Sequence, residues 1–235
     1  MPDTPASPDE LMDPHAAAPT GATTDAAPDA PARKRPRPGE RRVQILQTLA
    51  AMLEQPGGER VTTAALAARL EVSEAALYRH FASKAQMFEG LIDFIEQTVF
   101  SLINQIIEKE AAEPGPATGV RQARRIAGML VQFAEKNRGM ARVMVGDALV
   151  LENERLQQRM NALFDKVEAT IKQCLRDAAL LSPPGTRGPD PQVQAATVVA
   201  LVAGRLQRFA RSGFKRLPSE HLDAGLGLIL DWKAA

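Results

Sequence analysis

The stretch TTAALAARLEVSEAALYRHFASK, residues 62–84, places two short apolar-periodic segments on either side of a tight turn. Thr62 or Thr63 can serve as the N-cap of a first helix over 63–70, because a hydroxyl accepts a hydrogen bond from a free backbone N–H. Ser73, which follows the turn, can cap a second helix, and this helix is predicted over 73–81. The pattern therefore predicts two short helices joined by a sharp turn.

The second of these helices divides its residues between two sides. Ala76, Leu77 and Phe81 are expected to face the core. The outer side carries small or polar residues, namely Ser73, Glu74, Ala75, Tyr78, Arg79 and His80. This is the pattern of a helix-turn-helix, whose second helix enters the DNA major groove and contacts base edges through its N-terminal residues. Small residues there allow a close approach.

A further cap follows at Ser83, with Gln86 three residues later, as in a capping box. Lys84 then occupies the first position of a helix, where the helix dipole disfavours a cation. A DNA phosphate beside this helix end would reverse that effect. The alternative is a helical hairpin with incidental surface polarity, in which Tyr78 is a half-buried aromatic residue and His80 a surface or capping group.

The rest of the chain also predicts helices. Apolar periodicity and Gly/Pro breaks indicate a first helix from Glu40 to Leu53 and further helices at about 84–110, 119–136, 139–150, 153–180, 191–212 and 219–233. No convincing strand is present, so the expected fold class is all-α.

Residues 1–38 hold nine of the seventeen prolines and few large apolar residues, which predicts a disordered arm. Its first 32 residues carry six acidic and no basic residues, and the tract RKRPRPGERR follows at 33–42. Beyond residue 32 the chain holds 29 basic and 22 acidic residues, which suits a polyanionic partner. The basic end of the arm either contacts nucleic acid phosphate or is a solvated linker.

The sequence lacks the residue patterns typical of disulfide-linked proteins, metal sites and enzymes. The single cysteine, Cys174, excludes an internal disulfide, and His15, His80 and His221 are scattered. There is no Gly-rich phosphate loop or catalytic motif. Asp147, Glu152 and Glu154 are better explained as acids on a helix surface than as a metal site. We expect no enzyme activity, metal or cofactor, and a cytoplasmic protein without a signal peptide or membrane span.

Helix 84–110 carries more apolar residues than one core-facing stripe requires, so it is either buried nearly all round or partly a partner site. Phe94, off the Phe88/Ile92/Ile95/Val99 stripe, is the candidate partner-binding residue. In helix 153–180, Leu156, Met160, Leu163, Val167 and Cys174 fit a short coiled coil or, preferably, a core stripe.

VTTAALAARLEVSEAALYRHFASKAQMF resembles the DNA-binding region of TetR-family regulators. The resemblance implies an N-terminal three-helix DNA-binding domain at 39–99 with its helix-turn-helix at 62–81. It also implies a larger regulatory and dimerisation domain at 100–235. Two C-terminal helices per subunit would form a four-helix dimer interface, so that a homodimer reads a palindromic double-stranded site. The implied DNA-binding residues are Thr62, Thr63, Ser73, Glu74, Ala75, Tyr78, Arg79 and His80, with Lys84 on a phosphate.

The stretches NRGMARVMVGDALVLENERLQQRMNALFDKVEA and RFARSGFKRLP are similar to those of one group within this family, the nucleoid occlusion factors. This resemblance implies a nucleoid-associated DNA binder that inhibits cell division by antagonising the tubulin-like protein FtsZ. The chain departs from that group in its long arm and in the loop PPGTRGPDP. The alternative is a ligand-responsive TetR-type transcriptional repressor, although the single Trp and single Tyr argue against a drug-sized pocket.

Overall fold

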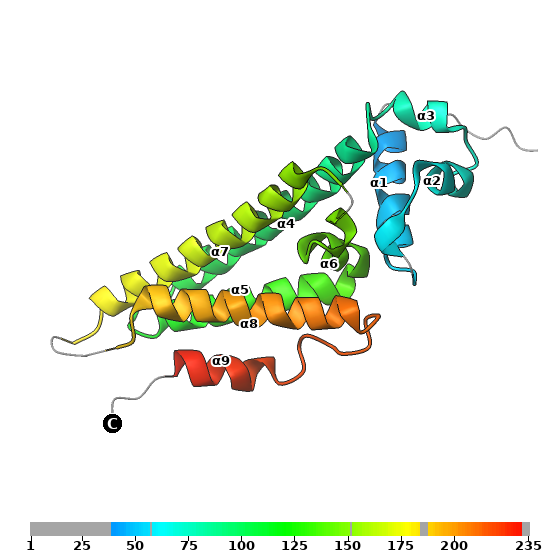
Figure 1. Cartoon of the computed structure of the whole chain (residues 1–235). Helices are drawn as coiled ribbons and strands as arrows, with labels where there is room; N and C mark the ends of the chain where they lie inside the picture. The colour runs from blue at the N-terminus through cyan, green and yellow to red at the C-terminus, as the bar shows by residue number, and fades with distance from the viewer. Residues whose placement is uncertain (1–38, 57, 151, 184–187, 232–235) are drawn as a thin grey trace, which may run out of the picture. The chain divides into compact units, whose positions relative to one another are not determined.

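The computed structural model describes residues 39–56, 58–150, 152–183 and 188–231, so the arm at 1–38 lies outside the described residues. All regular structure in these ranges is helical, which confirms the all-α class. The elements, shown in Figure 1, are α1 (Glu40–Leu53), η1 (Gly58–Arg60), α2 (Thr63–Arg69), α3 (Glu74–Tyr78), α4 (Lys84–Ala111), α5 (Thr118–Lys136), α6 (Arg138–Met144), η2 (Asp147–Leu149), α7 (Glu154–Leu180), α8 (Pro191–Arg211) and α9 (Leu222–Leu230).

Helices α1, α2 and α3 share one small apolar core. Ile45 and Leu49 of α1 are buried together with Leu66 of α2 and Leu77 of α3, each about 1% exposed. Burying side chains of this size stabilises each by roughly 1.5–3 kcal/mol relative to exposure, which offsets the cost of ordering helices too short to persist alone. Phe81, just beyond α3, closes this core at the start of α4.

Helix α4 joins this three-helix unit to the rest of the chain. Its inner stripe, from Met87 to Ile103, is buried, and α7 runs alongside it in Figure 1. Ion pairs connect the two helices on their outer side: Arg155 of α7 pairs with Glu89, and Arg159 pairs with Asp93 at 2.9 Å and with Glu96 at 2.6 Å. Helix α4 is therefore fixed against α7 by apolar packing and by charge.

Helix α5 lies at the centre of the larger helical part and packs against α4, α7, α8 and α9. Its Arg124 reaches both ends of α9, where it pairs with Asp223 at 2.8 Å and with both carboxylate oxygens of Asp231 at 2.7 Å. These bonds and their charges raise the pKa of the Arg124 guanidinium, with Asp231 the largest cause. Arg124 thus holds α9 in place along its length.

Close backbone contact between α6 and α1 joins the two parts a second time. A Cβ added at Gly139 of α6 would overlap the carbonyl oxygen of Ala50 in α1, so only glycine allows this approach. Arg142, one turn further along α6, donates to the carbonyl oxygen of Gln55 at 3.4 Å. The orientation of α1 is therefore coupled to α6.

Three helix predictions need correction. The second helix of the helix-turn-helix was expected over 73–81, but α3 ends at Tyr78. The helix expected over 139–150 is broken, because Gly146 adopts a left-handed conformation (φ 81°) between α6 and η2. The helix expected from 219 begins only at Leu222, after a left-handed His221 (φ 56°).

The structure decides between the alternatives left open for the two long helices, α4 and α7. Helix α4 is not buried all round: Phe94 is 47% exposed, and Phe100, Leu102 and Ile106 are partly exposed. The stripe on α7 is buried within the chain's own core, from Leu156 at 0% to Cys174 at 6% exposed, which confirms the core interpretation over a coiled coil. The domain boundary predicted at residue 99 falls inside α4, which continues unbroken across it.

Most apolar residues of the C-terminal pair face inward as well. Val198, Val202, Leu206 and Phe209 of α8 and Leu222, Leu226 and Leu230 of α9 are buried in the same chain. The exposed side of the pair consists of other residues: Val193 is 60% and Leu228 is 90% exposed, and Thr197, Ala200 and Gly204 of α8 are exposed as well. No helix among the described residues has the length and apolar character needed to cross a membrane.

Candidate nucleic-acid interface

Side-chain caps define where the two short helices begin. The hydroxyl of Thr62 accepts from the backbone N–H of Ala65 at 3.2 Å, and the hydroxyl of Ser73 accepts from that of Ala76 at 3.3 Å. Each cap satisfies a donor that the helix leaves free, which contributes roughly 1 kcal/mol. Of the two threonines considered as the first cap, the structure therefore selects Thr62.

Thr63 connects two helices and does not cap α2. Its hydroxyl donates to the carboxylate of Glu74 at 2.6 Å, which joins the first turn of α2 to the first turn of α3. The carboxylate also lies at the positive end of α3, where the helix dipole favours it. The beginning of α3 is thus held by a side chain from α2.

The predicted outer side of α3 is exposed. Glu74, Ala75, Tyr78, Arg79 and His80 are all exposed, and Tyr78 is 45% exposed. In contrast, Leu77 and Phe81 are buried, as expected. Since α3 ends at Tyr78, Arg79 and His80 project from the turn after the helix rather than from its last turn. The structure thus leaves these five residues open to solvent, whereas Thr63 and Lys84 are only partly exposed.

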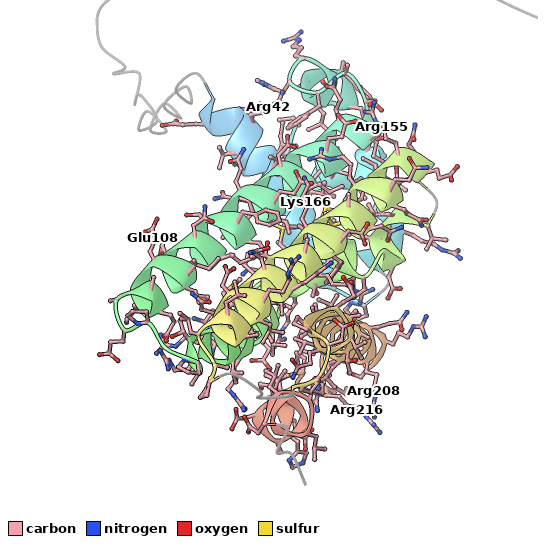
Figure 2. All side chains as sticks on the ribbon, turned by 90° about the vertical axis from the view of Figure 1, so that its left-hand side faces the viewer. Arg42, Glu108, Arg155, Lys166, Arg208 and Arg216 are labelled. Atoms are coloured by element: carbon pink, nitrogen blue, oxygen red, sulfur yellow. The ribbon has the colours of Figure 1, made fainter. Side chains whose placement is uncertain are left out.

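The end of α3 is held by Arg42, a residue that no sequence motif marks as part of this site. Its guanidinium donates to the carbonyl oxygen of His80 at 2.6 Å and lies 4.1 Å from the centre of the Phe81 ring. Figure 2 shows Arg42 at the start of α1. The only signal in the sequence was its place at the end of the basic tract, which suggested a phosphate contact instead.

Lys84 lies at the first position of α4, behind the predicted cap. The hydroxyl of Ser83 accepts from the backbone N–H of Gln86 at 3.2 Å. The side-chain oxygen of Gln86 in turn accepts from the backbone N–H of Ala82 at 2.8 Å. Lys84 itself bonds Glu152 at 2.5 Å. Glu152 therefore supplies a negative charge within the chain, so the position of Lys84 at the start of α4 does not require a DNA phosphate to be relieved.

Comparison with known proteins identifies this architecture. Residues 45–91 match the family described as bacterial regulatory proteins, tetR family, and residues 117–231 match the SlmA-like family, tetracyclin repressor-like, C-terminal domain. The structure is similar to the TetR family transcriptional regulator PfmR from Thermus thermophilus (TM-score 0.61, 20% identity, 82% of this chain and 96% of that chain). It is also similar to FadR from Bacillus subtilis, solved with stearoyl-CoA (TM-score 0.62, 14% identity, 82% and 99%). At these identities the likeness concerns the fold alone.

Sequence similarity identifies a narrower group within this fold. The chain is 48% identical to the nucleoid occlusion factor SlmA of Idiomarina loihiensis, over 78% of this chain and 90% of that protein. It is 46% identical to SlmA of Aliivibrio fischeri, over 83% of this chain and 96% of that protein. The chain therefore belongs to the TetR family and, within it, to the SlmA-like proteins.

Proposed function

We propose that this chain is a sequence-specific DNA-binding nucleoid occlusion factor that inhibits cell division by antagonising FtsZ assembly over the chromosome. The single observation that supports DNA binding most strongly is the exposed surface of α3. Its small residue Ala75 permits close approach, and Tyr78, Arg79 and His80 offer donors and acceptors to base edges. Thr62 and Ser73, as caps, lie at helix N-termini that favour phosphate.

We assign base recognition to Glu74 and the orientation of its carboxylate to Thr63. A carboxylate at the start of the recognition helix can accept from the amino group of cytosine, and it repels phosphate. The bond from Thr63 fixes the direction of that carboxylate before DNA arrives. Lys84 contributes a phosphate contact once it leaves Glu152.

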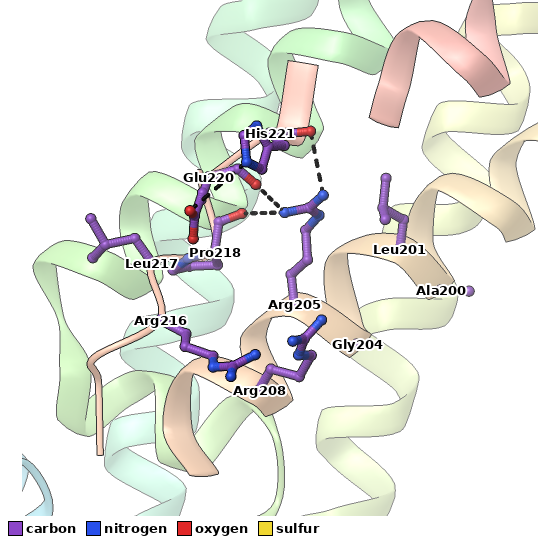
Figure 3. Close-up of a pocket in the computed structure, with 10 residues that line it drawn as sticks. All are labelled: Ala200, Leu201, Gly204, Arg205, Arg208, Arg216, Leu217, Pro218, Glu220 and His221. Carbon is purple, nitrogen blue, oxygen red and sulfur yellow. Dashed lines mark hydrogen bonds and ion pairs between the residues drawn. The ribbon is translucent and has the colours of Figure 1, made fainter. Parts of the chain in front are cut away.

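A homodimer follows from the two-fold symmetry of a palindromic site. The exposed side of α8 and α9 provides a surface for the second copy, because small residues such as Ala200 and Gly204 allow close helix packing. Figure 3 shows both at a hollow of about 610 Å³ between α8 and the segment that leads to α9. Arg205 braces that segment by donating to the carbonyl oxygens of Pro218, Glu220 and His221.

The names of the sequence relatives support a role in nucleoid occlusion. For the FtsZ contact we propose the outer surface of α4 around Phe94, since a large aromatic ring left 47% exposed provides apolar area for a partner. This places the partner surface on the helix that begins directly after the DNA-binding unit.

One observation favours the alternative, a ligand-responsive repressor. A largely apolar cavity of about 320 Å³ lies where the ends of α4 and α7 meet the start of α5, with Cys174 and Gly119 in its lining. Burial raises the pKa of the Cys174 thiol to about 11, which keeps the thiol neutral, and the acidic residue Asp177 also lines the cavity. The volume is at the lower limit of ligand sites, roughly 300–1,000 Å³. It suits a small ligand better than a drug-sized one.

DNA recognition is tested by selecting fragments of the organism's genome on the purified protein. Recovery of a palindromic sequence, bound as a dimer in sedimentation experiments, supports the proposal. Equal recovery of unrelated fragments would contradict sequence-specific binding.

A further inference from the structure

Arg42 makes two contacts that both lie at the end of the recognition helix. Its guanidinium donates to the carbonyl oxygen of His80 at 2.6 Å, and its central carbon lies 4.1 Å from the centre of the Phe81 ring. The two contacts belong to consecutive residues, yet Arg42 itself precedes His80 by 38 positions. One side chain thus connects the first turn of α1 to the residues that follow Tyr78.

The recognition helix needs such support because it is short. Helix α3 has five residues, and isolated helices of that length do not persist in water. Its last turn is already tight, since the N–H groups of His80 and Phe81 both donate to the carbonyl oxygen of Leu77, at 2.9 and 3.1 Å. The side chain of Arg42 adds a bond from outside the helix, so the direction of this turn no longer depends on local bonds alone.

The geometry requires arginine. A guanidinium is planar, so it stacks on an aromatic ring with one face and donates hydrogen bonds from its edge. Phe81 is about 1% exposed, which makes the ring a fixed platform in the core of the three-helix unit. A lysine ammonium can replace the charge and one hydrogen bond, but it cannot reproduce the stacked arrangement.

The two ends of α3 are therefore held by side chains from two other helices. At its start Thr63 of α2 donates to Glu74, and at its end Arg42 of α1 donates to His80. We propose that Arg42 is a positioning residue for sequence readout: it fixes the turn after Tyr78, which carries Arg79 and His80, and thereby sets the angle at which Tyr78 and Arg79 meet base edges. This inference rests on the proposed DNA-binding function.

A phosphate contact by Arg42 would have different consequences. Phosphate contacts contribute about equally to all DNA sequences and to the salt dependence of binding. Positioning of base-reading residues contributes to the operator alone. The ratio of affinities for the operator and for a scrambled duplex therefore separates the two roles.

Arg41 provides a matched control, since it is the neighbouring arginine in the same turn of α1. Its side chain donates to Gln44 of its own helix at 2.7 Å, so Arg41→Gln removes the same charge without touching α3. The experiment compares the full chain with Arg42→Gln, Arg42→Lys and Arg41→Gln. For each protein, the affinity for the selected operator and for a scrambled duplex is measured over a range of salt concentrations.

We expect Arg42→Gln to reduce the operator-to-scrambled affinity ratio about tenfold, as loss of one charge-assisted hydrogen bond would. Arg42→Lys should recover part of the ratio, and Arg41→Gln should leave it unchanged. In the DNA-free protein, Arg42→Gln should speed amide hydrogen exchange at His80 and Phe81 while the thermal unfolding midpoint stays close to that of Arg41→Gln.

An equal loss of affinity for both duplexes, with a smaller salt slope, would overturn the inference and make Arg42 a phosphate contact. An unchanged ratio with unchanged exchange at His80 would overturn it as well. Neither result affects the proposed function, which depends on the unaltered protein preferring its operator. If the unaltered protein shows no preference, the proposed function fails, and the exchange measurement still decides whether Arg42 holds the turn.

Discussion

The ammonium group of Lys84 lies 2.5 Å from the carboxylate of Glu152. Lys84 begins α4 directly after the helix-turn-helix, and Glu152 precedes the first turn of α7, so one ion pair joins the DNA-binding unit to the larger helical part. Both side chains are partly withdrawn from solvent, Lys84 to 31% and Glu152 to 10% exposure. A DNA phosphate that binds Lys84 has to compete with Glu152.

This competition predicts opposite effects for the two residues. Glu152→Gln frees Lys84 and should strengthen binding to all DNA sequences by about threefold, in line with the modest value of a partly exposed ion pair. Lys84→Ala should weaken binding to all sequences and lower the salt slope by about one unit. Titrations of operator and scrambled duplexes over a range of salt concentrations measure both. A Lys84→Ala variant with the original salt slope would exclude a phosphate contact.

Tyr78 and Arg79 should carry sequence specificity. Replacing either with Ala removes a group from the exposed surface of α3 and is expected to cost about 1–3 kcal/mol of operator binding, with little effect on a scrambled duplex. Arg176→Ala is a suitable control, since it removes an exposed arginine from α7, well along the chain from the helix-turn-helix. If the scrambled duplex loses affinity to the same extent, these side chains are not base-reading residues.

Phe94→Ala should separate the two proposed activities. Its ring is 47% exposed, so its loss leaves the apolar stripe of α4 and hence the fold intact. We expect unchanged operator affinity and weaker inhibition of FtsZ assembly, measured by light scattering and sedimentation of polymers. Leu180→Ala, at an 84% exposed position on α7, serves as the control. Full inhibition by Phe94→Ala would remove this residue from the partner surface.

The loss of stability as pH falls should depend in part on Glu110. This carboxylate accepts from Arg121 at 2.8 Å and pairs with Arg125 at 2.8 Å, and the bond from Arg121 is the largest cause that lowers its pKa below the ordinary 4.5. Because the folded pKa lies below the unfolded value, the stabilisation is complete above the unfolded pKa and disappears as pH falls through the folded pKa.

Glu110→Gln should therefore lower the free energy of unfolding at neutral pH, and the difference from the unaltered protein should shrink below the ordinary carboxyl range. Urea unfolding at a series of pH values gives this difference. Glu108→Gln, on the exposed side of the same helix, is the control. A difference that stays constant down to strongly acidic pH would show that the Glu110 carboxylate is not stabilised by its arginines.

Features that depend on neighbouring residues could be predicted from the sequence. Thr62, Ser73 and Ser83 each cap the helix that their hydroxyls indicated, because capping involves backbone groups only two or three residues away. The buried stripe of α7 followed from its spacing for the same reason. The helix break at Gly146 was missed, since a single glycine inside an apolar pattern looks the same whether or not it leaves the helical conformation.

Contacts between distant residues could not be predicted in this way. Nothing in the spacing of Arg42 and His80, or of Lys84 and Glu152, indicates that they meet, because these pairs form only when whole helices pack. The apolar residues of α8 and α9 show the same limit. The resemblance to TetR-family regulators implied that these two helices form a surface for a second copy. Most of their apolar residues fill the core of their own chain, and the smaller residues Ala200 and Gly204 remain exposed.

The most direct test of the proposed function is FtsZ polymer assembly in the presence of the purified protein, with and without DNA selected from its own genome. The proposed function predicts that polymers are lost when the protein and its cognate DNA are both present, and that scrambled DNA of the same length has a much smaller effect. Polymers that persist while the cognate DNA remains tightly bound would contradict it and favour a transcriptional repressor.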